Sequence, residues 1–201
     1  MKLFPFNALL ARMKQVPLCD PMKPSRPESL SEHTADTALL AHTLALISLR
    51  ILHVPEDEVR PEQLTVAALY HDAPQLLLDR LPLPAAYRDA GPDVIRAASW
   101  YESAEQLLRL APDALQADLR SYLSGAVLTP KERQLLKAAE LLATLLKDME
   151  EAKAGHPAFQ TAQEQHRTAL RGLHCPEADY FAEHMLPCCT MDAEPSACAQ
   201  D

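Results

Sequence analysis

Leucine supplies most of the apolar character of this chain, and the β-branched aliphatic residues are scarce. The sequence contains 34 Leu against 3 Ile and 6 Val, and it has only 4 Gly. Strands favour branched side chains and tight hairpins need glycine, so a sheet-rich fold is nearly excluded. Leucine and alanine form helices readily, and the composition therefore predicts an all-α fold.

Proline and capping signals divide the chain into helical segments. The 201 residues suit a single domain, which we expect over 1–187, with a short polar tail over 188–201. Ser29 with Glu32, and Thr129 with Glu132, have the spacing of a capping box. The expected bundle of about eight helices, with no sheet, covers 3–16, 30–53, 61–73, 92–110, 112–123, 130–153, 158–172 and 177–186.

Charge and cysteine content limit the partners and the compartment. The net charge is −9, so neither long nucleic acid nor an anionic membrane is an expected partner. The sequence contains no stretch of 18 apolar residues, so no membrane span is predicted. The 5 cysteines are odd in number and include no CxxC pair, which fits reduced thiols and a cytoplasmic location.

Four polar residues stand in apolar surroundings and are candidate metal ligands: His33, His71, Asp72 and Glu140. The His71-Asp72 pair ends an apolar helical segment, where two polar groups cost desolvation energy unless something binds them. A divalent metal ion is one explanation, because imidazole and carboxylate are its usual ligands. The alternatives are a histidine paired with its neighbours, a solvent-exposed His33, and a Glu140 that pairs with Lys137 on a wet helix face.

The order of several motifs points to one family. These motifs are SEHT (31–34), ALYHDA (68–73), LPLP (81–84), KAAELLATLLK (137–147) and ADYF (178–181). With them the chain resembles the HD-domain metal-dependent phosphohydrolases, and most closely the bacterial 5′-deoxynucleotidases. The resemblance implies an all-α, usually dimeric enzyme that removes the 5′-phosphate from deoxyribonucleoside monophosphates. It also implies one divalent metal ion (Mn, Co, Zn, Ni, Fe or Mg), held here by His33, His71, Asp72 and Glu140.

Two departures from the family pattern concern catalysis. The last metal ligand is Asp in the family and Glu140 here, which moves the carboxylate by about one C–C bond. The family's catalytic Glu is replaced by Gln75. An amide can orient a water molecule but cannot take up or deliver a proton at neutral pH. We therefore expect Asp72 and Gln75 to act at the reaction centre, with Gln75 positioning water.

Further departures concern substrate binding. An acidic residue of the family pattern aligns with Arg80, and its neighbour Asp79 is a candidate substitute. The phosphate-binding Arg-Trp pair of the family aligns with residues 18–19, which are Leu and Cys. Arg80, Lys23 or Arg26 are then candidates to replace the lost phosphate contact. Substrate binding is accordingly predicted at Arg80, Asp79 and Arg26.

The function that the sequence favours is metal-dependent hydrolysis of a nucleoside 5′-monophosphate. The main alternative is a catalytically degenerate HD-domain protein that binds a nucleotide, a metal or a protein partner. A purely structural helical dimer leaves the His71-Asp72 pair unexplained. Trp100 is expected in the core or at a dimer contact, and the acidic cluster Asp148, Glu150 and Glu151 is expected on a solvated face.

Overall fold

The computed structural model describes residues 3–18, 23–78 and 91–190. No strand occurs among these residues, so the predicted all-α class is confirmed. The elements are α1 (Phe6–Leu10), η1 (Ala11–Gln15), α2 (Leu30–Arg50), α3 (Pro61–Tyr70), α4 (Gln75–Leu78), α5 (Pro92–Leu108), α6 (Asp113–Leu123), α7 (Pro130–Lys153), α8 (Pro157–Gly172), α9 (Pro176–His184) and η3 (Leu186–Thr190).

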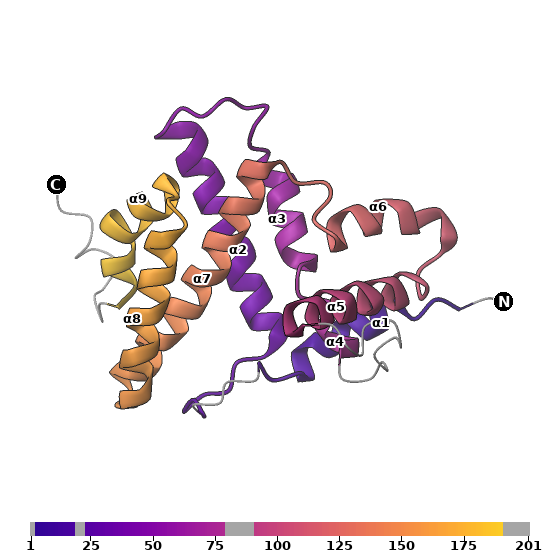
Figure 1. Cartoon of the computed structure of the whole chain (residues 1–201), viewed down its shortest axis with the longest axis horizontal. Helices are drawn as coiled ribbons and strands as arrows, with labels where there is room; N and C mark the ends of the chain where they lie inside the picture. Colours follow the sequence, from indigo (N-terminus) through magenta and orange to yellow (C-terminus); the bar gives the residue numbers. More distant parts are fainter. Residues whose placement is uncertain (1–2, 19–22, 79–90, 191–201) are drawn as a thin grey trace.

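Two long helices, α2 and α7, lie against each other at the centre of the domain (Figure 1). Helix α3 packs along α2, while α8 packs along α7 and α9 contacts both central helices. The main core lies among these helices, and Leu44, Leu64, Leu135 and Leu142 are fully buried in it. Helices α4 and α5 pack together near the start of α2, and α1 lies close to them (Figure 1).

The starts of α2 and α7 follow the sequence signals. The Ser29 hydroxyl accepts a hydrogen bond from the Glu32 amide at 3.2 Å, and the Glu32 carboxylate accepts one from the Ser29 amide at 2.8 Å. Thr129 and Glu132 form the same reciprocal pair. Both predicted capping boxes are therefore confirmed, and they fix where the two central helices begin.

The expected helix over 61–73 ends earlier, at Tyr70. Pro74 disfavours helical backbone at the residue before it and has no N–H to donate. His71 and Asp72 consequently lie in a turn between α3 and α4, where the Ala73 amide donates to the Tyr70 carbonyl at 3.1 Å. The pair was expected at the end of a helix and lies just beyond it.

The chain ends differ from expectation in smaller ways. The segment expected as one helix over 3–16 is a short α-helix followed by the 3₁₀ turn η1. The expected tail begins at 188, but residues 186–190 form the 3₁₀ segment η3. The rest of the tail and the LPLP connector lie outside the described residues. In the part of the chain that the structure describes, no helix has the length and apolarity needed to cross a bilayer.

The acidic cluster near the end of α7 is largely buried, so its predicted solvent exposure is wrong for two of its members. Asp148 and Glu151 are 2% and 0% exposed. The Asp148 carboxylate lies 2.6 Å from Nδ1 of His166 on α8. Burial of these carboxylates is tolerated because each has hydrogen-bonding partners.

Glu151 ties the loop before α2 to α7. Its carboxylate accepts hydrogen bonds from the backbone amides of Ser25 at 2.7 Å and Arg26 at 3.3 Å, and from Lys147 at 2.8 Å. Burial alone would raise the pKa of Glu151, but these donors outweigh burial and lower the pKa to about 2. The carboxylate is therefore charged at neutral pH and anchors the loop that leads into α2.

We expect Glu151→Ala to lower the free energy of unfolding by about 2–4 kcal/mol, because it removes a buried carboxylate that accepts hydrogen bonds from Ser25, Arg26 and Lys147. The matched control is Glu150→Ala, which removes an exposed partner of the same Lys147 and costs less than about 1 kcal/mol. Urea unfolding at neutral pH measures both values.

The pKa of Glu151 also predicts how its contribution to the free energy of unfolding changes with pH. The pKa of Glu151 is lowered from 4.5 to about 2 on folding, so its stabilising effect is complete above pH 4.5 and disappears as the pH falls toward 2. The difference in unfolding free energy between wild type and Glu151→Ala should shrink over that interval. A difference that stays constant from pH 5 to pH 2.5 would contradict the anchoring role.

Candidate metal centre

His33 lies in the first turn of α2, where the capping box fixes its position. Its amide donates to the Ser29 carbonyl at 3.1 Å, and its side chain is buried. Nε2 of the imidazole lies 3.9 Å from Oδ2 of Asp72. The predicted alternative of a solvent-exposed first-turn histidine is thereby excluded.

His71 has a defined orientation in the turn after α3. Its Nδ1 lies 2.5 Å from the carbonyl oxygen of Ala68, and a carbonyl can only accept, so Nδ1 carries the proton. Nε2 is then the nitrogen with a free lone pair. It is buried, makes no hydrogen bond of good geometry, and lies 3.1 Å from Oδ2 of Asp72.

The three side chains form a group that fits a divalent ion. Ligand atoms of His33, His71 and Asp72 all lie within 4.8 Å of one another. Ligands about 2.0–2.2 Å from one ion lie roughly 3–4.4 Å apart, so the observed spacing is close to what a single ion needs. The orphaned Nε2 of His71 and the mixed imidazole–carboxylate donors are the features that such an ion would satisfy.

Glu140, on α7, stands at the edge of this group. Its Oε1 lies 3.9 Å from Nε2 of His71, while its Oε2 accepts a hydrogen bond from Lys137 at 2.7 Å. The sequence left two alternatives open for this residue, an inward-facing ligand and a surface partner of Lys137. The pairing with Lys137 is present, and the other oxygen faces His71, but Glu140 is not part of the group formed by His33, His71 and Asp72, so its role as a ligand stays a prediction.

A cavity of about 460 Å³ opens beside the group. Its walls include four residues that sequence reasoning did not assign to the site, namely Trp100, Lys137, Leu141 and Thr144. Lys137 had a usable signal, since it lies one helical turn before Glu140. Trp100 had none, because the packing of α5 against α4 decides its place. The lining residues are His33, His71, Asp72, Trp100, Lys137, Glu140, Leu141 and Thr144.

Contact between His71 and Asp72 shifts the pKa of each, and an ion on Nε2 of His71 would take the place of the second imidazole proton. Burial would lower the pKa of His71, but the Asp72 carboxylate and the Ala68 carbonyl reverse this and raise it. Burial would raise the pKa of Asp72, but contact with His71 lowers it. Asp72 therefore presents a carboxylate to the cavity at neutral pH, as a metal ligand must.

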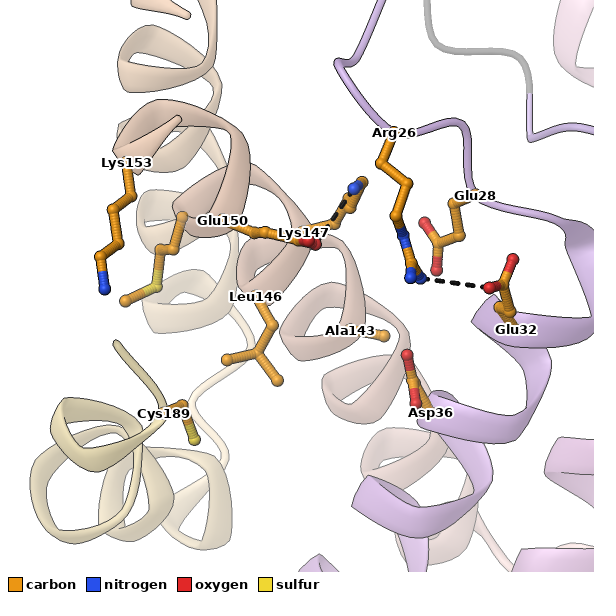
Figure 2. A pocket seen from close by; sticks show the side chains of 11 residues that line it. Arg26, Glu28, Glu32, Asp36, Ala143, Leu146, Lys147, Glu150, Lys153 and Cys189 are labelled. Carbon is orange, nitrogen blue, oxygen red and sulfur yellow. Dashed lines mark hydrogen bonds and ion pairs between the residues drawn. The ribbon is translucent and has the colours of Figure 1, made fainter. Parts of the chain in front are cut away.

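The other predicted site residues lie further away or outside the described residues. Gln75 begins α4, and its backbone N–H donates a hydrogen bond to the Asp72 carbonyl at 3.0 Å. Its side chain is not in the cavity wall. Arg26 pairs with Glu32 at 3.1 Å and lines a separate cavity of about 410 Å³ (Figure 2). Arg80 and Asp79 lie outside the described residues.

Comparison with solved structures defines the class of fold. An HD-domain phosphohydrolase from Listeria innocua superposes with a TM-score of 0.73 over 92% of this chain and 87% of its own, at 17% identity. A conserved hypothetical protein from Pyrococcus furiosus gives a TM-score of 0.54 over 84% of this chain and 98% of its own, at 19% identity. The chain therefore has the fold of the HD-domain phosphohydrolases.

Sequence comparison defines the family within that class. A family model described as "5'-deoxynucleotidase YfbR-like" matches residues 5–189. The 5′-deoxynucleotidase PM0747 of Pasteurella multocida is 30% identical, over 93% of this chain and 94% of its own length. The 5′-deoxynucleotidase ECA3034 of Pectobacterium atrosepticum is 32% identical, over 90% of each chain. The chain belongs to the YfbR-like 5′-deoxynucleotidase family.

The geometry predicts that the purified protein binds one Mn²⁺ or Co²⁺ per chain. His71→Ala and Asp72→Ala should each weaken this binding at least about tenfold, because each removes a ligand atom from the group. His42→Ala, a substitution on α2 outside the group, serves as the control. Isothermal titration calorimetry measures the affinities, and equal affinities for all four proteins would place the metal elsewhere.

Proposed function

We propose that this protein is a divalent-metal-dependent phosphohydrolase that acts on nucleoside 5′-monophosphates. The observation that carries the proposal is the convergence of His33, His71 and Asp72 on one point beside an open cavity. Its relatives are named 5′-deoxynucleotidases, which supports a nucleotide as substrate. Deoxyribonucleotides are accordingly the first substrates to test.

Six of the lining residues have a role suited to this chemistry. His33, His71 and Asp72, with Glu140, would hold the ion, which when bound supplies a nucleophilic hydroxide at neutral pH. Lys137 places an ammonium group at the cavity wall, where it can bind a phosphoryl oxygen. Trp100 covers part of the cavity with an apolar surface, which limits the access of bulk water and strengthens charge interactions inside.

Proton transfer is the weak point of this proposed site. Gln75 can orient water through its amide but cannot exchange a proton at neutral pH. General acid–base groups typically contribute about 10²–10⁴-fold to a rate, so we propose an enzyme that turns over slowly. The roles of Arg80, Asp79 and Arg26 in substrate binding, the homodimer and the cytoplasmic location stay predictions.

Phosphate release tests the function. Purified protein is incubated with deoxyribo- and ribonucleoside 5′-monophosphates in the presence of Mn²⁺, Co²⁺ or Mg²⁺, with an EDTA control. We expect metal-dependent release that His71→Ala and Asp72→Ala abolish and His42→Ala leaves intact. Metal binding without release from any substrate would support the alternative of a catalytically degenerate binding protein.

Gln75→Glu tests the missing proton-transfer group directly. We expect kcat to rise at least about tenfold, a floor below the usual contribution of a general acid or base. Gln160→Glu makes the same change at an exposed position on α8 and should leave kcat unchanged. An unchanged kcat in Gln75→Glu would mean that a carboxylate at this position does not reach the reaction centre.

A further inference from the structure

We propose that Glu28 is a positioning residue for the metal centre: its carboxylate accepts the Nδ1 proton of His33 and so aims Nε2 at the ion. This inference rests on the proposed metal centre and concerns a residue that the site above does not use. Glu28 precedes α2 and lies five residues before His33. The closest atoms of the pair, Glu28 Oε1 and His33 Nδ1, are 3.6 Å apart.

The two ring nitrogens of His33 have different surroundings. Nε2 points to Asp72, on the side of the proposed ion. Nδ1 is buried and makes no hydrogen bond within the described residues. A buried ring nitrogen without a partner is costly, so the nearest acceptor is its natural partner. That acceptor is Glu28.

The Glu28 carboxylate is itself buried without a strong partner. The residue is only 9% exposed, and the ion contact to His33 is the only polar contact of its side chain among the described residues. Arg26, the nearest arginine in the chain, pairs with Glu32 instead. A charge-assisted hydrogen bond from an imidazole N–H would stabilise such a buried carboxylate, which otherwise has no strong donor.

The backbone around Glu28 is held on both sides, which fixes where its side chain begins. The Leu18 amide donates to the Glu28 carbonyl at 2.8 Å. The next residue, Ser29, forms the capping box of α2 and a β-bridge with Pro17. His33 follows one turn later on the same helix. The pair is thus presented by one rigid segment, as a preorganised contact requires.

The other charged residues near Glu28 are already paired or repel it, so His33 is the partner available to its carboxylate. Glu28 stands in the wall of the second cavity together with Arg26, Glu32, Asp36 and Lys147 (Figure 2). Lys147 is already bound to Glu150 and Glu151. Burial, and then the negative charge of Glu28, raise the pKa of Asp36, so this neighbour offers Glu28 repulsion rather than a counter-charge.

Metal binding and this contact favour each other. When Nε2 of an imidazole binds an ion, the remaining proton must sit on Nδ1, and a carboxylate that accepts it fixes the ring and strengthens the metal bond. The present 3.6 Å separation is about half an ångström longer than a hydrogen bond, so the contact shortens when the proton is fixed on Nδ1.

Metal affinity is the first test. Glu28→Ala should weaken binding of Mn²⁺ or Co²⁺ by about 10–100-fold, the usual effect of removing such a partner. Glu28→Gln should lose less, because its amide oxygen still accepts the Nδ1 proton. Glu150→Gln, a change in the wall of the same cavity without contact to His33, should bind the metal as wild type does. Equal affinity in Glu28→Ala and wild type would overturn the proposal.

The tautomer of His33 is a second readout that needs neither metal nor activity. Imidazole ¹⁵N shifts of the metal-free protein, recorded where His33 is neutral, should show the Nδ1–H form in wild type and the Nε2–H form in Glu28→Ala. An Nε2–H form in wild type would overturn the proposal even if Glu28→Ala did not fold. Metal binding by wild type without phosphate release would refute the proposed function alone, whereas absence of metal binding would refute both proposals.

Discussion

The site depends on a buried carboxylate that belongs to none of its reactive groups. Glu151, near the end of α7, accepts the backbone amides of Ser25 and Arg26 and thereby attaches the loop before α2 to the far central helix. The same loop carries the capping box that starts α2, and His33 follows one turn later. The Glu151 carboxylate is fully buried, and leaving it without these donors would cost more than about 1–3 kcal/mol, which favours this arrangement of the loop. These contacts near the end of α7 add to the direct packing of α2 on α7, which places His33 and Glu140 on facing helices.

Several parts of this arrangement could be predicted from the sequence because their causes are local. Ser29 and Thr129 identify the starts of α2 and α7, since capping depends on residues only three positions apart. Proline positions locate most of the breaks between helices. The grouping of His33, His71 and Asp72 also followed from their order along the chain, but only through the family pattern.

Other parts could not be predicted, because tertiary contacts decide them. Asp148, Glu150 and Glu151 form one acidic run in the sequence, yet only Glu150 is exposed. The difference arises from His166 on α8 and from the loop at residues 25–26, both remote in sequence. Trp100 on α5 likewise lines a cavity whose other walls come from α2, α7 and the turn after α3, which are remote from it in sequence.

Two departures from the family pattern concern residues at or near the proposed site. Glu140 lies 3.9 Å from Nε2 of His71 with one oxygen and pairs with Lys137 through the other, and Lys137 itself lines the cavity. Gln75, three residues after Asp72, is uncharged where the family pattern has a glutamate, although its side chain does not line the cavity. In the proposed function, a bound divalent ion would offset the charges of Asp72 and Glu140, and the Lys137 ammonium at the cavity wall would attract a phosphomonoester dianion. In the proposed function, Gln75 cannot exchange protons as a glutamate would, so the chain would bind a nucleotide phosphate better than it hydrolyses one.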